Sequence, residues 1–300
     1  MNQLVILSGK GGTGKTSVAA SFAHLLSQQN TPFKTVIADA DVDASNLELV
    51  LSPSSVSREE FWGGSIAEID PENCTACGIC AEVCRFDAVN IKEGIYSIDP
   101  IACEGCAACV YQCPEKAIRM KEEMAGEWYQ SDSKYGPLFH AMLFPAQENS
   151  GKLVTIVKQQ ARLLALDEAY DLVLVDGPPG IGCPVISAVS GADLALIVAE
   201  PTASGVHDMH RVLKTTAHFG VLALVCINKA DIYPQGTNEI EEFCQQEGIR
   251  VVGKIPYDTA VPESIVLGKP VTEYQEESAA SVSIRFVWEE VMKILQEMEK

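Results

Sequence analysis

The chain has 300 residues, a formal net charge of −19 at pH 7 and 47% hydrophobic residues. This length suggests about two domains, and the acidic balance argues against nucleic acid or anionic lipid as a main partner, because both are negatively charged. No apolar run approaches the roughly 18 residues that a membrane helix needs, and no signal peptide precedes the first glycine-rich loop. Eleven cysteines without an export signal favour metal binding in a reducing cytoplasm over disulfides.

The chain begins with the pattern strand, loop, helix, strand. Residues 4–7 form a short apolar run, the loop GKGGTGK follows, and residues 16–29 carry apolar side chains on one helical face. A second buried strand is predicted at 35–39. From 52 to 65 the composition turns to Ser, Pro and Gly, which is typical of a linker.

An internal repeat follows this linker. Ile69-Asp70-Pro71 returns as Ile98-Asp99-Pro100, and the flanking cysteines are repeated with the same offset of 29 residues. The two matching runs are Cys74, Cys77, Cys80 and Cys84, and then Cys103, Cys106, Cys109 and Cys113. A duplicated unit explains this match, and the segment is expected to close near 121–127.

Buried strands and helices alternate beyond the repeat. The strands are predicted at 171–176, 192–200, 221–228 and 249–255, and the helices at 152–168, 205–218, 236–247 and 282–298. The alternation predicts an α/β fold with a mostly parallel sheet and helices on both faces, split by a small cysteine-rich insert. The last helix is not basic, so we expect it to pack on the sheet rather than bind a membrane.

Residues 9–16 match G-x-x-x-x-G-K-[ST] between the first strand and helix, which is the pattern of a P-loop NTPase. The glycines let backbone N–H groups converge on phosphate oxygens, and the helix N-terminus adds its dipole. Lys15 is expected to reach the β- and γ-phosphates and Thr16 to bind Mg²⁺. The nucleotide-binding residues expected in this loop are Gly11, Gly12, Thr13, Gly14, Lys15, Thr16 and Ser17.

Lys10, within KGGTGKT, makes the loop resemble the deviant Walker A motif of the MinD/ParA/Mrp superfamily of ATPases and the nitrogenase iron protein. The resemblance implies a homodimer in which Lys10 acts catalytically on the partner's nucleotide, as an arginine finger does. ADADVDASNL (38–47) resembles switch I of that group, which implies that Asp41 orients the attacking water and that Asp39 lies beside Mg²⁺. DGPPG (176–180) resembles switch II, with Asp176 as the carboxylate on the Mg²⁺ side.

The same resemblance implies where the base of the nucleotide is held. Asn228 in CINKAD falls where the group contacts the adenine edge, and IPYDTAVPES (255–264) resembles the loop that closes over the base. From that loop we expect contributions from Pro256, Tyr257 and Asp258. The preference for adenine over guanine rests on resemblance alone.

The two cysteine runs each read C-x2-C-x2-C-x3-C and resemble a bacterial ferredoxin with two [4Fe–4S] clusters. In such a domain the fourth cysteine of each run binds the other cluster. Cluster one would use Cys74, Cys77, Cys80 and Cys113, and cluster two would use Cys103, Cys106, Cys109 and Cys84. Arg85 stands where a proline is usual. Zinc is the alternative, but zinc sites prefer two cysteine pairs that are separated by a longer loop.

The other cysteines and histidines indicate less. We expect Cys226 to pack in the core and Cys183 to be a small residue packed near switch II, whereas Cys244, in a polar helix, gives no indication of a role. A cluster bridging two subunits through Cys183 is not expected, because no second cysteine lies between 127 and 175. His207 and His210 share one helix face, and exposure of that face to solvent explains them better than metal binding does.

The resemblance covers nearly the whole chain. It assigns 1–57 and 126–300 to a MinD-like P-loop ATPase domain and 66–122 to a ferredoxin-like domain. Three functions are compatible with it: ATP-gated electron transfer to an unknown redox partner with a basic face, an iron–sulfur cluster carrier or assembly ATPase of Mrp type, and a redox-sensing, ATP-dependent binding switch. Eight thiolates would saturate two clusters, which favours the first. The expected cofactors are two [4Fe–4S] clusters and Mg²⁺ with ATP.

Overall fold

The computed structural model describes residues 1–28, 33–145, 147 and 150–298. The chain divides into two compact units. The first comprises Met1–Glu59, Trp128–Met142 and Ser150–Lys300, and the second comprises Glu60–Glu127 and Leu143–Asn149.

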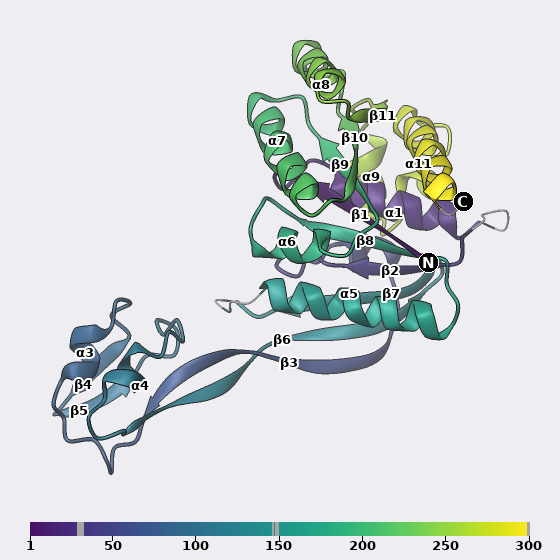
Figure 1. Ribbon diagram of the computed structural model, residues 1–300. Coiled ribbons are helices and arrows are strands. Elements are labelled where there is room, and N and C mark those ends of the chain that lie inside the picture. The colour runs from purple at the N-terminus through teal and green to yellow at the C-terminus, as the bar shows by residue number, and fades with distance from the viewer. Residues whose placement is uncertain (29–32, 146, 148–149, 299–300) are drawn as a thin grey trace. The chain divides into compact units, whose positions relative to one another are not determined.

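A mostly parallel sheet organises the first unit (Figure 1). Within the described residues the sheet has nine strands in the order β11-β10-β9-β1-β8-β2-β7-β6-β3, and β3 and β6 continue into the second unit. The strands are β1 (Asn2–Ser8), β2 (Thr35–Asp39), β3 (Ser54–Ile69), β6 (Ile118–Ser133), β7 (Gly136–Leu143), β8 (Leu172–Pro179), β9 (Leu194–Ala199), β10 (Leu222–Asn228) and β11 (Arg250–Ile255).

Parallel pairing brings the carboxyl ends of the central strands together. β1 lies between β8 and β9, with Val5 opposite Val175 and Ala195. β2 pairs with the other side of β8, so that Asp39 lies opposite Asp176. Every residue of β1 after Asn2 is buried, as expected for a strand covered by helices on both faces. The loops that follow β1, β2 and β8 therefore meet at one edge of the sheet.

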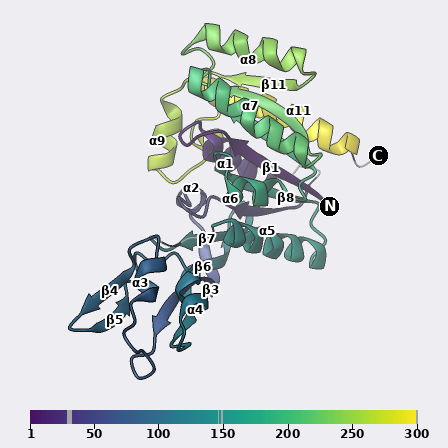
Figure 2. The ribbon, with the colours of Figure 1, turned by 60° about the vertical axis from the view of Figure 1, so that its left-hand side comes forward.

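Helices cover both faces of this sheet (Figures 1 and 2). On one face α1, α10 and α11 contact one another, and on the other α5, α6, α7 and α8 contact in succession. The helices are α1 (Lys15–Leu26), α2 (Leu47–Leu51), α5 (Ser150–Asp167), α6 (Cys183–Val189), α7 (Ala203–His218), α8 (Pro234–Gln246), α9 (Ala260–Val266), α10 (Val271–Tyr274) and α11 (Ala279–Met298). None of the described helices combines the length and the apolar character needed to cross a bilayer.

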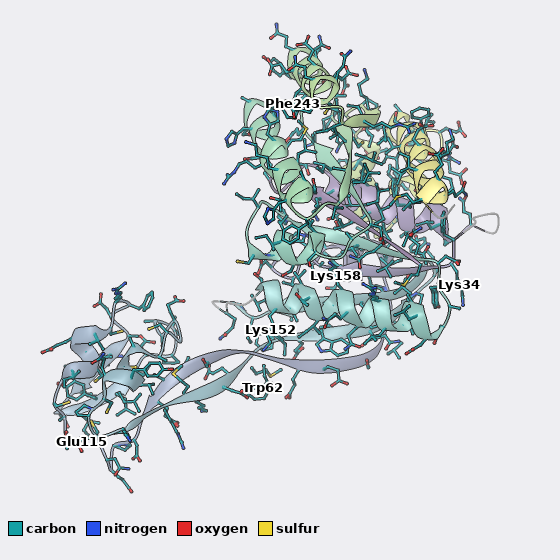
Figure 3. The ribbon with its side chains drawn as sticks, viewed as in Figure 1. Lys34, Trp62, Glu115, Lys152, Lys158 and Phe243 are labelled. Carbon is teal, nitrogen blue, oxygen red and sulfur yellow. The ribbon has the colours of Figure 1, made fainter. Side chains whose placement is uncertain are left out.

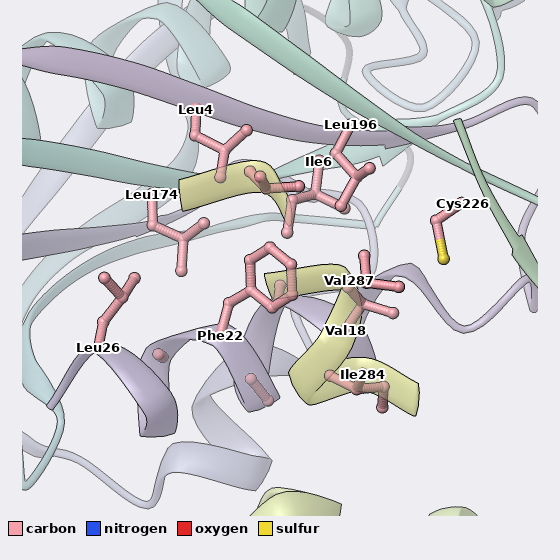
Figure 4. Close-up of a cluster of buried hydrophobic side chains, with 14 of the residues drawn as sticks. Leu4, Ile6, Val18, Phe22, Leu26, Leu174, Leu196, Cys226, Ile284 and Val287 are labelled. Atoms are coloured by element: carbon pink, nitrogen blue, oxygen red, sulfur yellow. The ribbon is translucent and has the colours of Figure 1, made fainter. Parts of the chain in front are cut away.

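Phe22 of α1 lies at the centre of the main core (Figure 4). Its fully buried ring lies among Leu4 and Ile6 of β1, Leu174 of β8 and Val287 of α11. Leu4 and Ile6 share a face because side chains alternate along a strand. Burying a phenylalanine contributes about 1.5–3 kcal/mol. The predicted packing of the last helix is confirmed, since α11 buries Ile284, Val287, Val291 and Leu295, whereas Met298 is exposed.

The predicted strands and helices after the repeat are confirmed, with shifted ends. The first helix was expected at 16–29; it begins at Lys15 and ends at Leu26, and residue 29 lies outside the described residues. The predicted linker at 52–65 is wrong, because β3 runs through it. Sheet pairing overrides the weak strand propensity of its Ser and Gly residues.

β3 and β6 form an antiparallel pair. The Ser54 hydroxyl donates to the Asp132 carbonyl at 3.3 Å, and the Asp70 N–H donates to the Ala117 carbonyl at 2.8 Å. The start of one strand therefore lies beside the end of the other. A two-residue turn then joins β6 to β7, and β7 pairs in parallel with β2.

The second unit shows the sequence repeat as an approximate two-fold. Its remaining elements are α3 (Ile79–Val83), β4 (Val89–Lys92), β5 (Ile95–Ile98) and α4 (Ala108–Gln112). The Asp70 N–H donates to Ala117 O, and the Asp99 N–H donates to Ala88 O at 2.7 Å. The offset of 29 residues relates Asp70 to Asp99 and Ala88 to Ala117, so each bond joins the beginning of one half to the end of the other.

The core of this unit is small. Its buried cluster consists of Ala67, Cys80 and Ile118, with partly buried neighbours that include Tyr96 and Ile98.

Candidate functional sites

The glycine-rich loop after β1 has the conformation that its sequence requires. Gly12 and Gly14 have φ of 78° and 90°, in the left-handed region that favours glycine. A Cβ atom on Gly14 would also collide with the side-chain amide of Asn228. The loop ends at Lys15, where α1 begins and its N-terminal N–H groups are free to bind an anion.

Lys15 is buried among the carboxylates at the ends of β2 and β8. Its ammonium lies 2.8 Å from Asp176 Oδ1 and 3.5 Å from Asp41 Oδ2. Burial alone would lower the pKa of Lys15, but the charges of Asp176 and Asp41 raise it. The lysine is therefore held charged inside the protein.

Asp39 is fully buried at the end of β2. Its carboxylate accepts hydrogen bonds from the Asp41 N–H at 3.1 Å, the Leu47 N–H at 3.0 Å and the Ser45 hydroxyl at 2.8 Å. Burial and the nearby Asp176 raise the pKa of Asp39 to about 7. Burial likewise raises the pKa of Asp41. A divalent cation would relieve the crowding of these acids, because it stabilises their ionised forms.

A cavity of about 1480 Å³ opens beside the loop. The predicted nucleotide-binding residues that line it are Gly11, Gly12, Thr13, Gly14, Lys15, Thr16, Ser17, Asn228, Pro256, Tyr257 and Asp258, and Asp41 lines it as well. Asp39 and Asp176 lie behind this wall, in contact with Asp41 and Lys15 respectively. The structure therefore brings the switch carboxylates and the loop lysine together at one end of the cavity.

Two residues expected at the base have their polar atoms engaged within the protein. The Asn228 amide donates to the Thr13 carbonyl at 2.7 Å, so it stabilises the loop. The Asp258 carboxylate accepts from the Ala260 and Ala280 N–H groups at 2.9 and 3.0 Å, and these bonds lower its pKa. Tyr257 is half exposed at the cavity wall.

Lys10 is held by its own chain. Its ammonium lies 3.0 Å from Glu200 Oε2 and donates to the hydroxyls of Thr202 and Ser204 at 3.1 and 3.3 Å. It does not line the nucleotide cavity. Glu200 also binds Lys229 at 3.2 Å, and Lys229 donates to the Gly12 carbonyl at 3.0 Å.

Sequence reasoning missed Glu200, Lys229 and a third residue, Lys158. The sequence signal that could have identified Lys229 is its position, because it directly follows Asn228 at the end of β10. The buried Lys158 of α5 (Figure 3) donates to the carbonyls of Ser187, Ala188 and Ser190, where α6 ends. Burial lowers the pKa of Lys158 to about 8. Through these three hydrogen bonds Lys158 holds the end of α6, the helix that follows the DGPPG segment.

In the second unit, each predicted set of four cysteines surrounds one cavity of about 340 Å³. The first cavity is lined by Cys74, Cys77, Cys80 and Cys113. The second is lined by Cys84, Cys103, Cys106 and Cys109. In both, the fourth cysteine comes from the other run.

The two cavities have equivalent, mostly apolar walls. The offset of 29 relates Ile69 to Ile98 and Glu115 to Phe86, and each of these residues lines its own cavity. The Ala117 N–H donates to Cys113 Sγ at 3.3 Å, and its counterpart Ala88 donates to Cys84 Sγ at 3.4 Å. Burial raises the pKa of the Cys80 and Cys109 thiols.

The loops that carry the cysteines adopt a strained backbone. Ala76 and Ala107 have φ of 57° and 59°, which costs a residue with a Cβ about 1–2 kcal/mol. Their neighbours Gly78 and Gly105 have φ of 84° and 63°. Strain of this kind tends to collect where a loop wraps a ligand.

The thiols do not converge on a point. Across the described residues, no group of three or more His, Cys, Asp or Glu is arranged to hold a single metal ion. Zinc would require sulfurs at about 2.3 Å from one centre. The cysteines of each set instead line a cavity.

The remaining cysteines and histidines differ in part from expectation. Cys226 is fully buried, as predicted, and burial raises its pKa to about 12. Cys244 is also buried. The predicted packing of Cys183 is wrong, because it begins α6 at the surface. The prediction for His210 is also wrong, since its ring stacks 3.7 Å from that of Phe243 on α8 (Figure 3).

The loop, the buried lysine and the carboxylates around one cavity define a P-loop nucleotide-binding protein. The family described as "CobQ/CobB/MinD/ParA nucleotide binding domain" matches residues 4–271, so the chain belongs to this family of ATP-binding proteins. The predicted α/β P-loop NTPase fold, with a large, mostly parallel sheet flanked by helices, is confirmed.

Comparison with individual proteins agrees with this assignment. An uncharacterised protein of Methanocaldococcus jannaschii is 34% identical over 293 residues, which cover 98% of this chain and 97% of the relative. A Pyrococcus horikoshii protein named iron-sulfur cluster carrier protein is 24% identical over 97% of this chain and 86% of its own length. The solved structure of the Pyrococcus furiosus cell division ATPase MinD has a TM-score of 0.58 at 20% identity, covering 98% of this chain and 99% of that chain. At this identity, the last comparison shows the fold alone.

Proposed function

We propose that this protein hydrolyses ATP and carries two [4Fe–4S] clusters, through which electrons pass to a partner protein under nucleotide control. The observation that carries the proposal is the crossed grouping of eight cysteines around two cavities. This grouping matches the ligand exchange of two-cluster ferredoxins. When bound, such clusters supply one-electron transfer.

The chain offers each cluster a complete set of thiolates. Cys74, Cys77, Cys80 and Cys113 would hold cluster one, and Cys103, Cys106, Cys109 and Cys84 would hold cluster two. The backbone N–H groups of Ala88 and Ala117 already donate to sulfur, and hydrogen bonds of this kind tune cluster potentials. The apolar walls would keep water away from the clusters.

The nucleotide unit would supply the ATPase. Lys15 would bind the β- and γ-phosphates of MgATP, Thr16, Asp39 and Asp176 would lie on the Mg²⁺ side, and Asp41 would orient the attacking water. Lys10 would act in a homodimer after release from Glu200. Membership in a nucleotide-binding family and the position of Lys15, Thr16 and Asp41 at one cavity support this assignment.

The cluster assignment is tested by anaerobic reconstitution with iron and sulfide. We expect about eight iron atoms per chain and an EPR signal after reduction with dithionite. Cys80→Ser and Cys109→Ser should each reduce the signal of one cluster, whereas Cys183→Ser, at an exposed cysteine outside both cavities, should change neither. Colourless protein without an EPR signal would refute the proposal.

The nucleotide control is tested by the midpoint potentials of the clusters with and without MgATP. We expect MgATP to shift a potential or to change the rate of reduction, and Asp41→Asn to abolish hydrolysis. If MgATP alters neither property, the two activities are independent.

The relative from Pyrococcus horikoshii favours a second function, because its name is that of a cluster carrier. Rapid, ATP-dependent transfer of a cluster to an apo-acceptor would support that function over electron transfer. A third function, a redox-sensing switch that binds a partner according to its ATP state, would be favoured if Asp41→Asn left hydrolysis and partner binding unchanged.

The redox partner should present a basic face. The chain already carries a formal charge of −19, and reduced clusters add negative charge. Binding of such a partner should weaken as salt rises, because screening shortens the range of the attraction.

A further inference from the structure

A second cavity adjoins the nucleotide cavity within the first unit. It has a volume of about 1330 Å³ and is lined by residues of the 42–55 segment and of β6 and β7. Ala44 and Leu49 line both cavities. The segment that contains α2 is therefore a wall common to the two cavities.

A chain of hydrogen bonds crosses from this wall to the two strands. Glu48 Oε2 of α2 lies 2.9 Å from His140 Nδ1 of β7, and His140 Nε2 lies 3.0 Å from the Ser131 hydroxyl of β6. The ring of Tyr129 stacks on the imidazole at 4.9 Å. Burial lowers the pKa of His140 to about 4, so the ring is neutral near pH 7. Nδ1–H then donates to Glu48, and Nε2 accepts from Ser131.

The other end of this chain reaches the nucleotide site. Asp39 accepts from the Leu47 N–H at 3.0 Å and from the Ser45 hydroxyl at 2.8 Å, and thereby holds the start of α2. Leu47 and Glu48 are consecutive residues of a helix of only five residues. Asp39 and Ser131 are thus joined through one short helix and one imidazole.

The order Ser131, His140, Glu48 has the composition of a nucleophilic triad, but its burial argues against that role. Ser131 is 1% exposed and His140 is 6% exposed. Ser131 lies within a strand and borders the second cavity, and its hydroxyl is bonded to the imidazole. A hydrogen-bonded set in which the serine and the histidine are buried instead fixes the relative positions of the elements it joins.

We propose that Glu48, His140 and Ser131 transmit the nucleotide state from Asp39 to β6 and β7, the strands through which the chain leads to the cysteine-containing unit. The proposal rests on the proposed function in one respect, namely that Asp39 responds to MgATP. A cation bound beside Asp39 changes the hydrogen bonds that its carboxylate accepts from Leu47 and Ser45, so α2 shifts and Glu48 shifts with it. His140 then passes the change to both strands, because it lies in β7 and its Nε2 contacts the Ser131 hydroxyl of β6.

Hydrogen exchange on the full chain, followed by mass spectrometry with and without MgATP, tests this coupling. In the wild type we expect MgATP to slow exchange in β6 and β7 by about fivefold or more. Glu48→Ala should keep nucleotide affinity within about twofold, because Glu48 does not line the nucleotide cavity, and should remove most of the response, because it deletes the acceptor for His140 Nδ1–H. Ser131→Ala should remove it in β6 and retain part of it in β7.

The matched control is Glu239→Ala, at an exposed glutamate of α8 that lines neither cavity. It should respond as the wild type does. An unchanged response in Glu48→Ala, or no response of β6 and β7 in a wild type that binds MgATP by calorimetry, would overturn the coupling. A wild type that binds no MgATP would instead overturn the proposed function, and the coupling with it.

Discussion

The two units of this chain are stabilised in different ways. The nucleotide unit has a large core around Phe22, and its buried Lys15 is neutralised by carboxylates of the same unit. The buried cluster of the cysteine unit consists of Ala67, Cys80 and Ile118, and its loops hold alanines in the left-handed region. Units with so small a cluster often rely on metals or disulfides for stability. We infer that packing maintains the first unit and that a thiol-bound group maintains the second.

Removal of iron should have the largest effect, and should affect only one unit. Chelation of reconstituted protein should unfold 60–127, because metal-binding free energy is folding free energy in small metal domains. Limited proteolysis should then cut within 60–127, while the nucleotide unit keeps a cooperative thermal transition. If 60–127 resists protease equally with and without iron, the contrast between the units is wrong.

A core truncation should produce the opposite pattern. Phe22→Ala should lower the free energy of unfolding of the nucleotide unit by about 3–5 kcal/mol, because it leaves a cavity beneath β1 and β8. Urea denaturation measures this loss, and the EPR signal of the clusters should be retained. The control is Phe286→Ala at an exposed position of α11, which should change stability by about 0.5 kcal/mol or less.

The nucleotide unit should also show a pH dependence that originates at Asp39. The pKa of this carboxyl is raised to about 7 by burial and by Asp176, from an ordinary value near 3.8. At pH values between these two pKa values, Asp39 keeps its proton in the folded state and has lost it in the unfolded state. Stability should therefore fall as pH rises from about 4 to 7, by on the order of 1 kcal/mol per pH unit from this group.

Denaturation across this pH range in wild type and Asp39→Asn isolates the effect. The variant cannot ionise at this position and should show a shallower slope. Equal slopes in the two proteins would mean that Asp39 is already ionised in the folded state.

The smallest effect is expected at the surface of the cysteine unit. Arg119 and Glu68 form an exposed ion pair at 2.6 Å. Arg119→Ala should change the stability of iron-loaded protein by about 1 kcal/mol or less, because exposed pairs contribute little. A loss of several kcal/mol in denaturation experiments would mean that β3 and β6 stabilise this unit more than its bound group does.

Local sequence patterns predicted much of this molecule. The buried strands, the glycine-rich loop and the cysteine spacing each depend on residues close together in the chain, and the two cysteine sets that the ferredoxin resemblance implies each line one cavity. The segment 52–65 was misread because its strand is stabilised by a distant partner, β6. Glu200 beside Lys10 and His140 beside Glu48 went unnoticed for the same reason, since only the folded sheet brings them together.

The antiparallel pairing of β3 and β6 has a consequence for how such a chain can be altered. Ser54 of β3 and Asp132 of β6 are cross-strand neighbours. The chain therefore leaves the first unit along β3 and returns to it along β6 at adjacent positions. We therefore expect that a short hairpin turn could join β3 to β6 within the first unit without breaking the ladder of the remaining strands.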